Sequence, residues 1–75
     1  MSDDPFIVHR SLLFTIAYEL LGSAADAEDT VQNTWLRWDA MGADRQAEVA
    51  DPRAYLVRIA SRQALNRLRT LARRK

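Results

Sequence analysis

The 75-residue sequence contains no cysteine, so no disulfide bond and no thiolate metal site can stabilise the fold. His9 is the only histidine, and no group of His, Asp and Glu residues has the spacing of a metal site or of an acid–base pair. The two glycines, Gly22 and Gly42, stand alone, so the chain lacks a Gly-rich phosphate-binding loop. These absences predict that the chain is not an enzyme and binds no metal or other cofactor.

Long apolar runs are also missing. No segment approaches the roughly 18 apolar residues that a membrane-spanning helix needs. The first residues carry Asp3 and Asp4, whereas a signal peptide begins with basic residues. The lack of cysteine fits a reducing compartment. We therefore expect a cytoplasmic protein with no membrane contact, and at this length one domain at most, of modest stability.

Acidic and basic residues are segregated along the chain. All ten acidic residues lie within residues 1–51, where only three arginines oppose them, so the net charge there is −7. Residues 52–75 contain eight basic residues and no acidic one, so their net charge is +8. This asymmetry indicates a different partner for each half, and a polyanion is the natural partner of the basic half.

Apolar residues recur at helical spacing in three segments, and no segment alternates as a strand does. Helices are expected over residues 5–21, 23–40 and 52–72. Only Gly22 and Ser23 separate the first two helices, which should form an antiparallel hairpin. The sequence thus predicts an all-α fold, a compact three-helix domain in which a basic third helix packs on this hairpin.

Local signals mark the ends of the predicted helices. Asp4 and Asp51 each precede a proline, and an acidic cap followed by proline is a common helix start. Gly22 should end the first helix. Ser23 and Asp26 approximate a capping box at the start of the second, with Asp in place of the usual Glu.

Each predicted helix has an apolar stripe that supplies the expected core. The stripes are Leu13, Ile16, Ala17 and Leu20, with Leu21 at the edge; Ala27, Val31, Trp35 and Trp38; and Leu56, Ala60, Ala64, Leu68 and Leu71, with Ile59 nearby. Trp35 is expected in the core, whereas Trp38 near the helix end could face a partner or the loop. Tyr55 could stack on a base or lie half-buried in the core, and the sequence leaves both roles open.

Residues 41–50 are predicted to form a loop, because they are polar, include Gly42 and lack a clear stripe, although a short helical turn within them remains an alternative. Loops of this length are functional or disordered. We expect the loop to be mobile until DNA binds, and to read a base edge through Asp44, Arg45 and Gln46.

The third helix carries the most informative constellation. Four arginines and one asparagine follow one another at spacings of four, four, three and four residues, which places them on a single face of the helix. They are Arg58, Arg62, Asn66, Arg69 and Arg73. Guanidinium groups bind phosphate oxygens in pairs, and a carboxamide can read a base edge. A solvated basic face is the plain alternative. Nucleic-acid contact is favoured over it because no acidic residue lies four positions away to neutralise any arginine.

The sequence resembles region 2 of the extracytoplasmic-function sigma factors. The resemblance covers about residues 10–75 and rests on a specific combination of segments: Leu12-Leu13-Phe14-Thr15-Ile16-Ala17-Tyr18, Ala25-Asp26-Ala27-Glu28-Asp29-Thr30-Val31-Gln32 with Trp35-Leu36-Arg37-Trp38, and Asp51-Pro52-Arg53-Ala54-Tyr55-Leu56-Val57-Arg58-Ile59-Ala60. Within this family, the sequence is most similar to the branch of sigma factors that carry an extra C-terminal domain. Two positions depart from the family pattern, because Asn66 stands where Asp is frequent and Asn33 where Glu is frequent.

The resemblance implies a transcription initiation factor that binds core RNA polymerase and recognises and melts the minus-ten element. Its expected polymerase-binding residues, which would dock on the clamp helices of the β′ subunit, are Asp26, Glu28, Asp29, Gln32 and Asn33. Spacing alone leaves open whether this polar side of the second helix binds a protein or is merely solvated.

The resemblance also implies that the loop and the third helix contact the non-template strand. The predicted DNA-contacting set is Arg58, Arg62, Gln63, Asn66, Arg69, Arg73, Asp44, Arg45 and Gln46. Region 4, which reads the minus-35 element in this family, is not part of the sequence. An anti-sigma regulator or a C-terminal domain is a further partner that the resemblance allows. The alternatives are a protein-interaction module whose basic helix binds an acidic regulator, and a nonspecific nucleic-acid-binding domain.

Overall fold

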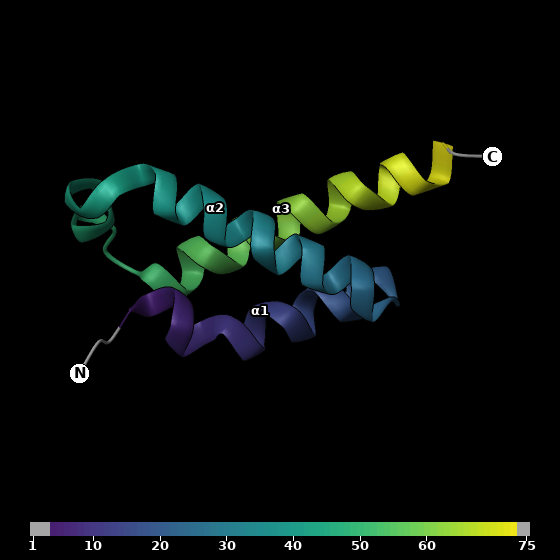
Figure 1. The fold of residues 1–75 in the computed structure, drawn as a ribbon, viewed down its shortest axis with the longest axis horizontal. Coiled ribbons are helices and arrows are strands. Elements are labelled where there is room, and N and C mark those ends of the chain that lie inside the picture. The colour runs from purple at the N-terminus through teal and green to yellow at the C-terminus, as the bar shows by residue number, and fades with distance from the viewer. Residues whose placement is uncertain (1–3, 74–75) are drawn as a thin grey trace.

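The computed structural model describes residues 4–73, which form three α-helices connected by short links (Figure 1). α1 spans Pro5–Leu21, α2 spans Ala24–Glu48 and α3 spans Pro52–Arg73. α1 and α2 form the predicted antiparallel hairpin, and α3 packs against both. The last turns of α3 extend beyond the hairpin, which makes the molecule elongated.

The helix ends form as the local signals predict. Oδ1 of Asp4 accepts a hydrogen bond from the backbone N–H of Phe6 at 2.9 Å, and Oδ1 of Asp51 accepts one from Ala54 at 3.1 Å. Gly22 adopts a φ of 70°, in the left-handed region that favours glycine, and its N–H donates to the carbonyl of Tyr18. These contacts satisfy backbone groups that a helix end would otherwise leave unpaired.

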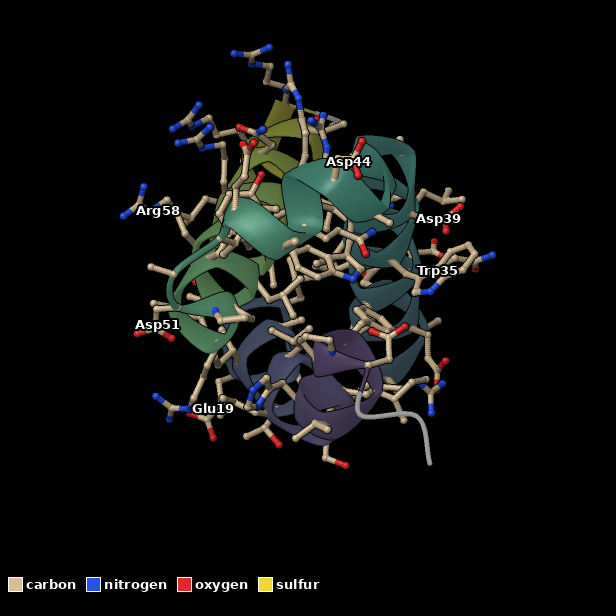
Figure 2. The ribbon with its side chains drawn as sticks, turned by 90° about the vertical axis from the view of Figure 1, so that its left-hand side faces the viewer. Glu19, Trp35, Asp39, Asp44, Asp51 and Arg58 are labelled. Atoms are coloured by element: carbon tan, nitrogen blue, oxygen red, sulfur yellow. The ribbon has the colours of Figure 1, made fainter. Side chains whose placement is uncertain are left out.

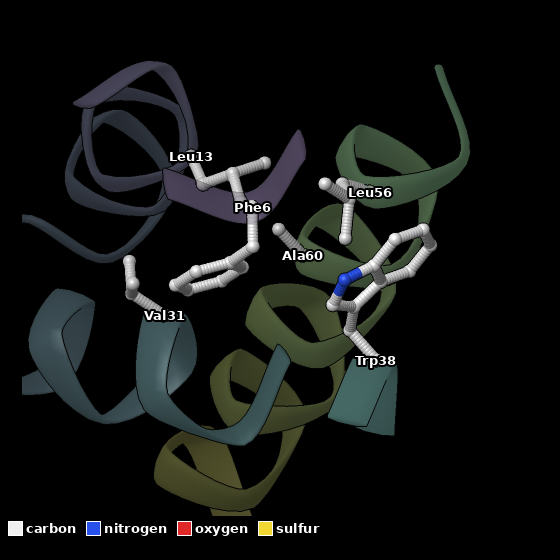
Figure 3. Packing of buried hydrophobic residues seen from close by; sticks show 6 residues of the cluster. All are labelled: Phe6, Leu13, Val31, Trp38, Leu56 and Ala60. Atoms are coloured by element: carbon white, nitrogen blue, oxygen red, sulfur yellow. The ribbon is translucent and has the colours of Figure 1, made fainter. Parts of the chain in front are cut away.

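The core lies where the three helices meet, and each helix contributes to it (Figure 3). The cluster consists of Phe6, Leu13, Val31, Trp38, Leu56 and Ala60. Ala17, Ala27 and Ala64 are also fully buried, and such small side chains allow helix backbones to approach closely. The predicted stripes of α1 and α3 are confirmed at their centres, while Leu68 and Leu71 near the end of α3 are only half-buried.

The core prediction for Trp35 is wrong, whereas Trp38, whose environment the sequence left open, is buried. Trp38 is 2% exposed and packs on Tyr55 with ring centroids 6.0 Å apart, whereas Trp35 is 38% exposed. Thr34 is buried in place of Trp35, and its hydroxyl donates to the carbonyl of Thr30 at 2.8 Å. A threonine whose hydroxyl is satisfied one turn back can lie in a core at little cost.

The segment of residues 41–50 is helical for most of its length, so the predicted loop is wrong and the alternative of a short helical turn within it is confirmed. α2 continues to Glu48, with a break at Gly42, where φ is 85° and ψ is 159°. Few residues other than glycine adopt that conformation, so the first helical stretch of α2 ends at Gly42 and a second, shorter stretch follows it up to Glu48. Met41 and Val49 pack against the core on the two sides of the turn. These contacts explain why a polar segment without a clear stripe is ordered as a helix.

Within residues 4–73, no helix is both long enough and apolar enough to cross a membrane.

Candidate nucleic-acid interface

The predicted basic face of α3 is exposed along its whole length. Arg58, Arg62, Asn66, Arg69 and Arg73 are all solvent-exposed. Figure 2 shows Arg58 projecting on the side of the molecule opposite Trp35 and Asp39. In the described part of the chain, none of the four arginines lies within ion-pair distance of a carboxylate. The face therefore presents uncompensated positive charge, as the sequence predicted.

This basic face forms one wall of an open groove between α3 and the end of α2. The groove has a volume of about 640 Å³. α3 contributes Arg58, Arg62 and Asn66 to it, and α2 contributes Arg37 and Arg45. Four arginines from two helices thus line one concavity, which concentrates positive charge in one place.

Of the two arginines that α2 contributes to the groove, the sequence predicted only one as a DNA contact. Arg45 was predicted from the sequence, although in a loop, and it reaches the groove because the turn at Gly42 folds the end of α2 toward α3. Arg37 was not predicted as a DNA contact. It lies one helical turn before Met41, which also lines the groove, so the spacing of the two residues was the available signal.

Tyr55 is an aromatic residue that lines this groove, and the sequence did not decide its role. Tyr55 lines the groove while its ring packs on the buried Trp38, so it is half-buried and accessible at once. Both roles considered for Tyr55 are compatible with this position. An aromatic side chain among the residues that line a cationic groove is a candidate for stacking on a nucleobase.

The remaining residues predicted to read a base are placed less favourably. Asp44 is exposed and does not line the groove. Gln46 is half-buried, and its Nε2 donates to the carbonyl of Trp38 at 2.6 Å. This bond connects the two parts of α2 across the turn at Gly42. Gln46 therefore has a structural partner that the sequence did not indicate.

Arg67 differs from the other arginines of α3, because it points toward α2. Its Nη2 lies 2.7 Å from Oδ1 of Asp26 and 3.2 Å from Oδ2 of Asp29, and its Nε donates to Oδ1 of Asp26 at 2.9 Å. The predicted capping box is thus only half formed. Oγ of Ser23 accepts from the N–H of Asp26 at 3.3 Å, but the Asp26 carboxylate binds Arg67 instead of returning to the cap.

The five residues that the resemblance assigns to the polymerase lie on different sides of α2. Asp26 and Asp29 pair with Arg67, as described above. Glu28 and Gln32 line a groove of about 200 Å³ between α1 and α2, together with the partly exposed Trp35. Asn33, by contrast, faces α3 and lines a groove with Gln63 and Asn66. Sequence spacing did not separate these three environments.

The chain is similar in sequence to known proteins. The Sigma-70 region 2 family model matches residues 6–74. The chain is 44% identical over all 75 residues to the ECF RNA polymerase sigma factor SigJ of Mycobacterium tuberculosis. It spans 23% of the length of that relative. No solved structure gives a significant match.

An all-helical fold, an uncompensated arginine face and a family match over almost the whole chain agree with one another. The chain belongs to the Sigma-70 region 2 family.

Proposed function

We propose that this domain acts in transcription initiation by binding core RNA polymerase through α2 and the non-template strand of the promoter minus-ten element through α3 and the adjoining groove. The observation that carries the proposal is the exposed, uncompensated face of α3, continuous with a groove to which α2 adds Arg37 and Arg45. The name of the similar protein, an RNA polymerase sigma factor, supports the same assignment.

The groove supplies the interactions that a single strand needs. Guanidinium groups of Arg58 and Arg62 bond phosphate oxygens and hold the strand in position without reading its sequence. Tyr55 offers a stacking surface, and the carboxamides of Gln63 and Asn66 offer donors and acceptors to a base edge. Capture of unstacked bases offsets part of the cost of unpairing them. Strand opening by this route requires no catalytic group.

The opposite side of the molecule carries the second proposed contact. Glu28, Gln32 and the partly exposed Trp35 line the groove between α1 and α2, together with the apolar side chains of Phe6 and Val31. An aromatic and an aliphatic side chain among polar groups are typical of a protein-binding surface. The proposed DNA contact thus lies on one side of the molecule and the proposed polymerase contact on another.

Two binding measurements test this function. The chain should co-purify with core RNA polymerase, and Gln32→Arg should lower the affinity while the circular dichroism spectrum stays unchanged. It should also bind short single-stranded DNAs containing a minus-ten element in preference to scrambled ones. A chain that binds single strands but not core polymerase would be a general nucleic-acid-binding domain. A chain that binds neither would sink the proposal.

A further inference from the structure

Within residues 4–73, Arg67 is the arginine of α3 whose guanidinium is paired with carboxylates. Its Nη2 lies 2.7 Å from Oδ1 of Asp26 and 3.2 Å from Oδ2 of Asp29, and its Nε donates to Oδ1 of Asp26 at 2.9 Å. Charge-assisted contacts of this length are the strong ones among hydrogen bonds. The side chain of Arg67 therefore stays on α2 as long as nothing else binds the two carboxylates.

This ion pair lies beside the basic face of α3. Arg67 lines a shallow groove of about 240 Å³ together with Gln63 and Asn66, and these two residues also line the larger basic groove. Arg67 follows Asn66 directly in the chain, so its long side chain starts next to the surface proposed to bind the DNA strand. Its charge is neutralised by α2. The basic groove is thus bordered by a further cation that is not available to DNA.

The ion pair is accessible enough to exchange partners. The side chain of Asp29 is 56% exposed, whereas those of Arg67 and Asp26 are 36% and 23% exposed. A basic group from another molecule can therefore approach Asp29 first and compete with Arg67 for it. Partly exposed ion pairs contribute little to stability, so replacing one cationic partner by another costs little free energy.

We infer that this ion pair is a charge switch. Asp26 and Asp29 withhold Arg67 from DNA, and a partner whose basic groups bind the two carboxylates releases Arg67 to the phosphates. The inference rests on the proposed function, in which this partner is core RNA polymerase, and deepens it by coupling the two contacts. The free domain then binds DNA with one cation fewer than its complex with the polymerase. Because such coupling is reciprocal, a bound strand raises the affinity for the polymerase by the same factor.

A mutant cycle in the free chain tests whether the carboxylates withhold Arg67. Each phosphate contact contributes about 0.7 to the steepness of log affinity against log salt for a single strand. Arg67→Gln should leave this steepness unchanged in the parent, because the guanidinium is occupied. In a chain that carries Asp26→Asn and Asp29→Asn, the same change should lower the steepness by about 0.7. Arg69→Gln, at a position without a carboxylate partner in the described part of the chain, should lower it in both backgrounds.

Glu19→Gln combined with Asp39→Asn provides the matched control. It removes two exposed carboxylates that form no ion pair within residues 4–73, so its change in net charge equals that of the other double variant. Arg67→Gln should still have no effect in this background. One short single strand is titrated at several low salt concentrations, where screening leaves the ion pair intact. Circular dichroism verifies that every variant keeps its helices.

The same titration with the core-polymerase complex tests the release. Arg67→Gln should there lower the steepness by about 0.7 relative to the parent complex. An equal loss in the free parent would make Arg67 an ordinary phosphate contact. No loss in the chain without the two carboxylates would show that a released Arg67 does not reach the strand. No loss in the complex would show that the polymerase does not release it. Each of these results overturns the inference and leaves the proposed function standing, whereas a parent that binds neither polymerase nor single strands refutes the proposed function itself.

Discussion

The two halves of α3 are attached to the molecule by different interactions. Residues 52–64 include Leu56, Ala60 and Ala64, which are completely buried against α1 and α2. Residues 65–73 include no fully buried side chain, and there the helix extends past the hairpin (Figure 1). The contact between this second half and α2 includes the ion pairs of Arg67 with Asp26 and Asp29.

This difference has a consequence for binding. Apolar burial depends little on ionic strength, whereas a partly exposed ion pair weakens as salt screens it. The first half of α3 should therefore keep its position at any ionic strength, while the second half is held by the half-buried Leu68 and Leu71 and by a salt-sensitive ion pair. The same basic face runs along both halves, so one end of it lies on a well-buried part of the helix and the other end does not.

The largest expected effect is the loss of packing in the first half. Leu56→Ala removes a completely buried side chain and leaves a cavity, which should lower the free energy of unfolding by about 2–5 kcal/mol. That is a large part of the stability of so small a domain. Urea denaturation followed by circular dichroism measures the change. Leu65→Ala, at an exposed position of the second half, should change stability by less than about 0.5 kcal/mol. Equal losses in the two variants would contradict the comparison.

The next effect concerns the turn that brings the end of α2 against the first half of α3. Gly42→Ala should destabilise the domain by about 1–3 kcal/mol, because φ of 85° with ψ of 159° is strained for any residue with a Cβ. Beyond the adjoining chain, no atom lies within 4 Å of the added Cβ, so the cost is local backbone strain and not a clash with the packed core. Thermal denaturation measures it, and Gly22→Ala, at φ 70° and ψ 13°, should cost less. A neutral Gly42→Ala variant would mean that the turn relaxes.

A smaller effect is expected in the second half. Arg67→Gln should reduce the free energy of unfolding by about 1 kcal/mol, because partly exposed ion pairs contribute little. A double-mutant cycle with Asp26→Asn isolates the pair, and the coupling energy should fall as salt is raised. Arg69→Gln is the matched control, since Arg69 has no carboxylate partner within ion-pair distance in the described part of the chain. Identical stability in the two glutamine variants would show that the Arg67 pair contributes nothing.

The smallest effect on stability should accompany a clear effect on binding. Arg58→Ala in the first half and Arg73→Ala in the second should each leave stability within about 0.5 kcal/mol of the parent. Each lost phosphate contact should lower the slope of log affinity against log salt by about 0.7 for a single strand. Titrations of single-stranded DNA at several salt concentrations measure this slope. An unchanged slope for Arg73→Ala alone would restrict the DNA contact to the first half.

Much of the fold could be predicted because its signals are local. Asp4, Gly22 and Ser23 act on backbone groups within a few residues, so their patterns are legible in the sequence. The helical structure after Gly42 could not be predicted from the sequence. It depends on contacts of Met41 and Val49 with the core and on the hydrogen bond from Gln46 to the carbonyl of Trp38. Local polarity suggested a loop there, and tertiary packing overrode it.

The candidate site was predictable in part for the same reason. The face of Arg58, Arg62, Asn66, Arg69 and Arg73 follows from spacing within one helix, so the sequence sufficed to define it. The groove depends on how α2 lies against α3. Arg37 and Tyr55 are therefore added to it, while Asp44 does not line it.

The sequence by itself determined three helices with their caps, the separation of acidic from basic residues and the alignment of the arginines, because each depends on neighbours along the chain. Only the tertiary structure decided that Trp38 is buried while Trp35 is exposed, and that Arg67 turns inward to a carboxylate 41 residues away. It also placed Asn33 beside the basic groove. Those outcomes depend on the rotation of each helix about its axis, which is set by the packing of all three helices together and not by spacing within any one of them.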